Sequence, residues 1–140
     1  MKYDDASWHF GGDFPSDLPR KNGAIHIAMF FAWAAQSHLL SDIYEESVCQ
    51  KHLAALTLHS GDYLYTFLQC CDGKLTNEEF SDAGNAFVAW YYKASYFEDY
   101  AQVFEQTGDT IYHVEPSWEH YDRLKPVLDE RFAEWQGRRT

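Results

Sequence analysis

Histidine and carboxylate side chains are the groups in this sequence that could hold a metal ion or transfer a proton. His52 and His59 stand seven residues apart in a segment with helical character, so both can lie on one helix face. Two turns separate them, which is too far for one zinc ion unless another part of the chain supplies a bridging ligand. This pair therefore does not predict a zinc site.

A second metal-like pattern is the segment Asp72–Phe80, DGKLTNEEF, which matches the second half of an EF-hand calcium loop. It has a glycine at the sharp turn and Glu79 at the bidentate position. The first half is missing, because the opening ligand positions fall on Leu68 and Cys70, whose side chains offer no oxygen. Thr76 and Glu79 can instead form a capping box. We therefore predict a helix cap here and no calcium site.

Adjacent carboxylates lie among polar neighbours, which is typical of solvated faces and helix caps rather than of acid–base pairs. Such pairs include Asp4-Asp5, Glu45-Glu46, Glu78-Glu79 and Glu98-Asp99. The sequence also lacks the nucleophile elbow, the Walker phosphate loop, the dinucleotide glycine fingerprint and the zinc-protease HExxH motif. We therefore expect no enzyme activity, no cofactor and no functional metal.

His26 is the only residue that is not apolar in the segment Ala24–Ala35, AIHIAMFFAWAA. A lone histidine on an apolar face is usually a core residue that is hydrogen-bonded to the backbone or to a hydroxyl group, and this is the interpretation that we favour. The alternative hypothesis is a small-molecule enzyme or sensor with a site near His26, Trp33 and His9.

The segment Ala24–Ala35 is apolar on every side, which predicts a buried central helix rather than a surface helix. At about 1.5 Å per residue it spans about 18 Å, too short to cross a bilayer of about 30 Å. Asn22 is the predicted N-cap of this helix.

The other elements are predicted from capping residues and apolar periodicity. The segment from Asp42 is predicted to form a helix capped with Glu45, with Ile43, Val48, Leu53 and Leu56 on its apolar face and its end at Ser60-Gly61-Asp62. We also expect an irregular N-terminal arm over residues 1–22 and a helix over Tyr63–Cys71 that could also be a strand. Further helices are expected over Asp82–Ala94, over Tyr96–Gln106 with Ser95 as its cap, and from Pro116 or Ser117 to about Gln136, where Pro126 kinks or splits the last one. The predicted fold is all-α, one domain over residues 1–140 with five to seven helices.

The net charge is −11, from 22 acidic and 11 basic residues. It argues against binding to nucleic acid or to an anionic membrane and favours a basic partner. Eight acids but only two lysines lie between Asp72 and Asp109, and aromatic residues make up 18% of the chain, so some of them are expected at the surface. The predicted partner-binding residues are Glu78, Glu79, Asp82, Trp90, Tyr92, Tyr96, Glu98 and Asp99. The alternative binding surface is the N-terminal arm around Trp8 to Asp17.

The three cysteines Cys49, Cys70 and Cys71 match no zinc or redox spacing, so reduced and partly buried thiols are expected. The chain opens without a charged segment followed by an apolar one, and no long apolar span follows. We therefore predict a cytoplasmic protein.

Four long strings carry a resemblance to a known family. They are YDDASWHFGGDFPSDLP, GAIHIAMFFAWA, DGKLTNEEFSDAGNAFVAWYY and YHVEPSWEHYDRLKPVLDERFAEW, which together cover most of the chain. The sequence resembles an uncharacterised bacterial family that carries only a domain-of-unknown-function label, and this resemblance assigns no role to any residue. Small acidic bacterial proteins of this kind also resemble immunity proteins of polymorphic-toxin systems, which bind and block a cognate toxin. That resemblance implies a non-enzymatic protein that binds a basic toxin; the oligomeric state stays open.

Overall fold

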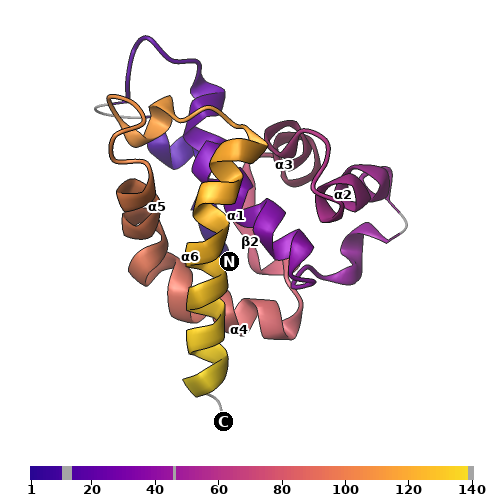
Figure 1. Cartoon of the computed structure of the whole chain (residues 1–140). Coiled ribbons are helices and arrows are strands. Elements are labelled where there is room, and N and C mark those ends of the chain that lie inside the picture. The colour runs from indigo at the N-terminus through magenta and orange to yellow at the C-terminus, as the bar shows by residue number, and fades with distance from the viewer. Residues whose placement is uncertain (11–13, 46, 139–140) are drawn as a thin grey trace.

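Helices make up most of the chain (Figure 1). This computed structural model describes residues 1–10, 14–45 and 47–138. Within these ranges the α-helices are α1 (Ile25–Gln36), α2 (Gln50–Thr57), α3 (Tyr63–Cys71), α4 (Asp82–Tyr91), α5 (Phe97–Val103) and α6 (Trp118–Arg138). The same ranges contain one small sheet, made of β1 (Lys2–Asp5) and β2 (Lys74–Thr76). The all-α prediction is therefore confirmed.

The central position of α1 is confirmed as well. Every residue from Ile25 to Ala35 is buried, because α2, α3 and α6 pack around this helix. The predicted N-cap is wrong, since the helix is preceded by a 3-10 turn, Arg20–Ala24. Asn22 lies in that turn, and its side-chain amide donates a hydrogen bond to the Tyr112 carbonyl oxygen at 2.8 Å.

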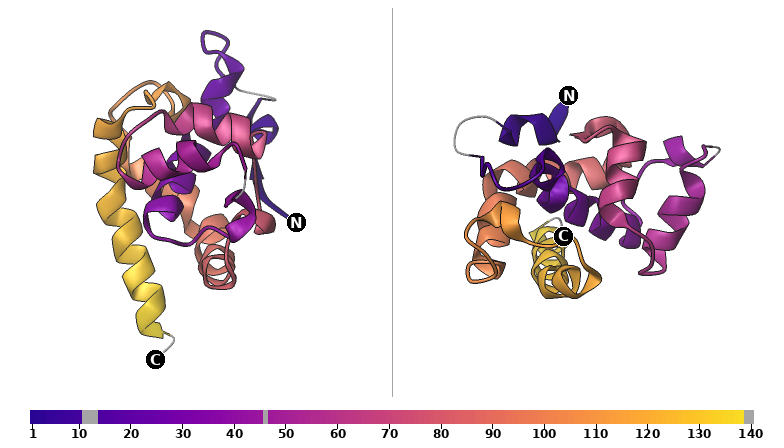
Figure 2. Two further views of the ribbon diagram at one scale, coloured as in Figure 1. Left: turned by 90° about the vertical axis from the view of Figure 1, so that its right-hand side faces the viewer. Right: turned by 90° about the horizontal axis from the view of Figure 1, so that it is seen from above.

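The N-terminal arm is more regular than expected. β1 pairs antiparallel with β2, with Asp4 opposite Leu75 and an irregularity in register between Lys2 and Asp4. A 3-10 turn, Ala6–His9, follows β1 directly. Figure 2 shows β1 and α6 on opposite sides of α1, so the arm covers a face of the central helix that α6 does not reach.

The predicted break at Ser95 does not exist. A π-helix, Tyr92–Tyr96, joins α4 to α5 and makes one helical run of residues 82–103. The rings of Tyr92 and Tyr96 lie 5.0 and 5.1 Å from the ring of Phe30 on α1. Because this packing holds the backbone helical through Ser95, the local capping signal is overridden.

The helix predicted from Asp42 is also corrected. Residues Asp42–Tyr44 form only a 3-10 turn, and α2 begins at Gln50. A capping residue cannot by itself sustain a helix, because the nucleus is costly unless an apolar face is buried. Here Ile43 and Val48, which were expected on that face, are exposed.

Two local predictions are confirmed by hydrogen bonds. The segment Tyr63–Cys71 is α3 rather than a strand, and the Asp62 side chain caps it by accepting from the Tyr65 backbone N–H at 2.9 Å. The capping box is also present, since the Glu79 carboxylate accepts from the Thr76 backbone N–H at 2.9 Å and from the Thr76 hydroxyl. A helix cap therefore accounts for the calcium-like pattern.

Pro126 lies inside α6 without splitting it. A proline removes the backbone hydrogen bond to the residue four positions earlier, here Asp122. Both residues are exposed, so water can solvate the carbonyl oxygen that is left. Within the described ranges, no helix has both the length and the apolar character needed to cross a membrane.

The cysteine prediction is wrong for two of the three residues. Cys49 and Cys70 form a disulfide whose Cα atoms are 6.0 Å apart, whereas Cys71 is free and buried. The pair was missed because the cysteines are 21 residues apart and only the packing of α2 against α3 brings them together. Since disulfides are rare in the cytosol, this bond gives no support to a cytoplasmic location, which stays a prediction.

Candidate functional site

Half of the residues predicted to bind a partner are buried: Glu79, Tyr92, Tyr96 and Asp99. The Tyr92 hydroxyl donates to Asp4 Oδ2 at 2.7 Å, and the Tyr96 hydroxyl donates to the His26 carbonyl oxygen. Both rings belong to the core around α1, so the prediction that they are surface anchors is wrong. The hydroxyl groups of both tyrosines have hydrogen-bond acceptors inside the protein, and these acceptors belong to residues that are distant in sequence.

The two buried carboxylates have structural partners too. Glu79 is part of the capping box with Thr76. Asp99 accepts two hydrogen bonds from the Arg131 guanidinium, at 2.9 and 3.0 Å, and one from the Tyr91 hydroxyl at 2.6 Å. These contacts use the negative charges within the fold, so neither residue belongs to an acidic surface.

The other four predicted residues, Glu78, Asp82, Trp90 and Glu98, reach the surface but do not converge. Asp82 and Glu98 are 16 residues apart on one helical run, which is about 24 Å along its axis. Exposed Lys93 lies between them, and the half-buried Trp90 ring is covered by the Arg138 guanidinium at 5.6 Å. The structure therefore does not assemble one acidic face from this segment.

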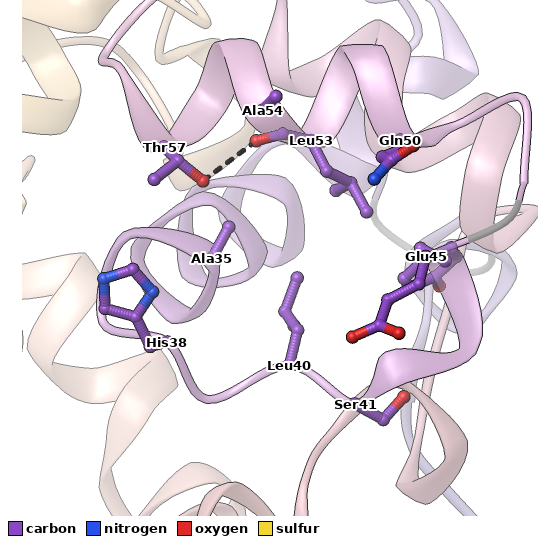
Figure 3. A pocket seen from close by; sticks show the side chains of 10 residues that line it. Ala35, His38, Leu40, Ser41, Glu45, Gln50, Leu53, Ala54 and Thr57 are labelled. Atoms are coloured by element: carbon purple, nitrogen blue, oxygen red, sulfur yellow. Dashed lines mark hydrogen bonds between the residues drawn. The ribbon is translucent and has the colours of Figure 1, made fainter.

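A groove of about 300 Å³ opens instead between the C-terminal end of α1, the segment 38–45 and α2 (Figure 3). Leu40, Leu53 and the Glu45 carboxylate point into it, and the Thr57 hydroxyl is held away by a hydrogen bond to the Leu53 carbonyl oxygen at 3.0 Å. The groove therefore combines apolar side chains with polar ones and a single carboxylate.

Large exposed apolar side chains flank this groove. Ile43, Val48 and Leu58 belong to the segments that form or adjoin it, and Val48 is 93% exposed. The sequence interpretation missed this surface because it placed Ile43 and Val48 on the buried face of a helix from Asp42, whereas the helix begins only at Gln50. Exposed apolar groups that gather around a hollow are typical of protein-binding sites.

A second candidate lies at the other end of α1, where three residues from separate elements meet. His9 Nε2 lies 2.9 Å from Asp4 Oδ1, and His26 Nε2 lies 3.5 Å from Asp4 Oδ2. The two imidazole rings are 4.5 Å apart, and His9 Nδ1 is 2.9 Å from the Tyr112 hydroxyl. Asp4 and His26 are buried, while the His9 side chain is 15% exposed.

Trp33 is not part of this cluster. It lies on α1 two turns after His26, and its indole N–H donates to Asp129 on α6 at 2.9 Å. The alternative site suggested by the sequence is therefore correct in bringing His26 and His9 together and wrong in including Trp33. The residues it missed are Asp4 and Tyr112, which no spacing in the sequence connects to His26.

Comparison with known proteins identifies the family of this chain. The family described as domain of unknown function DUF7832 matches residues 2–114, which is most of the chain. The chain belongs to this family. No curated protein and no solved structure matches it. The groove and the histidine cluster both lie inside the matched residues, whereas α6 lies outside them.

The electrostatics of the histidine cluster do not favour a nucleophile in this member of the DUF7832 family. Burial raises the pKa of Tyr112 and of Tyr92, and the Asp4 charge raises both further, so neither phenol is activated. Burial also opposes ionisation of Asp4, but its contacts with His26, His9 and Tyr92 outweigh that effect and hold its pKa below the usual range. Burial lowers the pKa of His26. The cluster is thus an ionised carboxylate beside a neutral imidazole.

Proposed function

We propose that this protein is a non-enzymatic binding protein for a basic protein partner, acting as an immunity protein acts on its toxin. The groove beside α1 carries the proposal, because its lining is partly apolar, one wall is acidic, and exposed apolar side chains lie in the segments that form or adjoin it. A large apolar side chain of a partner could fill it as an anchor. We therefore propose the region of residues 35–58 as the binding surface, in place of the segment of residues 72–109 that was expected from the sequence.

The charge around the groove supports a basic partner. Between His38 and Asp62 the sequence has four acids and one lysine. Within the described ranges, neither Asp42 nor Glu45 forms an ion pair, and both are exposed. Together with the net charge of −11, these groups would speed the approach of a cation-rich surface, whereas the apolar anchors would slow its release.

Site-specific cross-linking tests this proposal. A photoreactive p-benzoylphenylalanine replaces Val48 or Leu58 in the native host, with Ala133 on the exposed face of α6 as the control position. We expect positions 48 and 58 to capture the same basic protein and position 133 not to capture it. The product of the neighbouring gene is the first partner to examine.

Binding of the purified partner then decides the role of the groove. Val48→Asp is expected to weaken affinity at least tenfold through faster dissociation, while Ala133→Asp leaves it within about twofold. Glu45→Lys should slow association, and more so at low salt. Equal capture at all three positions, or equal affinities of the two Asp variants, would contradict the proposal.

A further inference from the structure

We propose that Asp4, His9 and His26 form a binding site for a divalent transition-metal ion such as Zn²⁺. Each residue offers one ligand atom, and these atoms lie within 4.8 Å of one another. They come from β1, from the turn that follows it and from α1. This inference is independent of the groove and of the function proposed for it.

The distances suit a metal centre. Zinc binds imidazole nitrogen and carboxylate oxygen at about 2.0–2.2 Å, so neighbouring ligand atoms of a tetrahedral site lie about 3.2–3.6 Å apart. The distance from Asp4 Oδ1 to His9 Nε2 is 2.9 Å, and the distance from Asp4 Oδ2 to His26 Nε2 is 3.5 Å. Both carboxylate–imidazole distances are therefore within about 0.3 Å of the range for a tetrahedral site.

The unpartnered imidazole of His26 points independently to a ligand. Neither Nδ1 nor Nε2 has a hydrogen-bond partner among the described residues, although the side chain is only 1% exposed. The contact of Nε2 with Asp4 is close but lacks hydrogen-bond geometry. A buried polar group without a partner is costly, and coordination to a metal would satisfy the lone pair of Nε2.

The surrounding residues hold the ligand groups in place. The Tyr92 hydroxyl donates to Asp4 Oδ2 at 2.7 Å, and the Asp5 backbone N–H donates to Asp4 Oδ1 at 2.8 Å. His9 contacts the Tyr112 hydroxyl through Nδ1 at 2.9 Å and presents Nε2 to Asp4. Metal-binding histidines are usually oriented through the second ring nitrogen in this way.

The chemistry of the three groups selects the class of ion. Two imidazole nitrogens and one carboxylate oxygen suit zinc and similar transition metals, whereas calcium and magnesium prefer oxygen ligands. His9 is the most exposed of the three, so an ion can enter beside it. A bound ion would fasten the N-terminal arm to α1, and three protein ligands leave a position for water.

Calorimetry on tag-free full-length protein, stripped with chelator, tests the site with ZnCl₂ as the titrant and MgCl₂ as the comparison. We expect one equivalent of zinc to bind and magnesium not to compete. His9→Ala should lower zinc affinity at least tenfold, since it removes one ligand of three. The matched control is His52→Ala, an exposed histidine outside the cluster, which should leave affinity unchanged.

Nuclear magnetic resonance of the unaltered protein gives a second measurement that does not depend on the folding of any variant. Zinc should shift the imidazole signals of His9 and His26 and leave those of His52 and His59 in place. The proposal is overturned by the absence of stoichiometric zinc binding, by equal losses in His9→Ala and His52→Ala, or by shifts confined to the exposed histidines.

Discussion

At its N-terminal end α1 presents His26 to β1 and the following turn, whereas at its C-terminal end Ala35 borders an open groove. The first end is closed by Tyr92, which donates to Asp4, and by Tyr112, which contacts His9. The second is walled by a short helix, α2, whose apolar neighbours remain exposed. One buried helix can thus support a polar cluster at one end and a solvent-facing groove at the other, depending on what covers each end.

The largest effect on stability is expected at the closed end, from Asp4→Ala. The substitution leaves the Tyr92 hydroxyl and the His9 imidazole without their acceptor, so the free energy of unfolding should fall by about 3 kcal/mol. Urea unfolding followed by circular dichroism measures it. Glu130→Ala, at an exposed position in α6, is the control and should change stability by less than about 0.5 kcal/mol. Equal effects would show that this acid does not hold the arm.

The disulfide supports the open end, and its loss should have an effect of similar size. Closing a loop between residues 21 positions apart is worth about 3 kcal/mol in the chain-entropy description, so the double substitution of Cys49 and Cys70 by Ser should reduce stability by about that amount.

Thiol labelling checks the pairing itself. Burial raises the pKa of Cys71 to about 12, so this thiol should resist alkylation in the folded protein. Mass spectrometry should find one label after unfolding and three after unfolding with reductant. Three labels without reductant would mean that the disulfide is absent.

A smaller loss is expected from Gly84→Ala, where α4 passes the segment that leads into the groove. A Cβ atom at residue 84 would lie 2.3 Å from the Leu39 carbonyl oxygen, which is backbone and cannot move aside easily. Alanine favours helix by about 1 kcal/mol, but the clash should outweigh this gain and leave a net loss of about 2 kcal/mol.

Gly137→Ala in α6 is the matched control for thermal unfolding, because a Cβ there meets nothing within 4 Å. It should be neutral or slightly stabilising. A similar response at residues 84 and 137 would show that α4 does not approach the Leu39 backbone closely.

The smallest effect concerns pH and Glu79, whose neighbours include Tyr44 at the groove. Burial raises the pKa of Glu79 above its ordinary value, so its protonated form is favoured in the folded state. Its contribution to stability is complete below about pH 4 and is lost as pH rises through the folded pKa. Relative to the wild type, Glu79→Gln should therefore gain stability from pH 4 to pH 7, and exposed Glu78→Gln should not. A relative loss over this range would reverse the assigned direction.

The elements that could be predicted from the sequence are those whose signals are local. The all-round apolar pattern of Ala24–Ala35 identified the central helix, and Thr76 with Glu79 identified a cap, because such signals depend on residues within about one turn. The same kind of signal failed at Asp42 and Ser95. At Asp42 no buried apolar face follows, and at Ser95 the packing of Tyr92 and Tyr96 on α1 keeps the chain helical.

Which functional groups meet depends on the packing of segments that are distant in sequence. His52 and His59 share a helix pattern but not a site, while Asp4 and His26 are 22 residues apart and come together because β1 pairs with β2 beside α1. The groove likewise depends on where α2 begins, and the disulfide on how α2 packs against α3. Such contacts form only when distant segments pack into the same core. Short-range periodicity in the sequence does not show which segments will pack together.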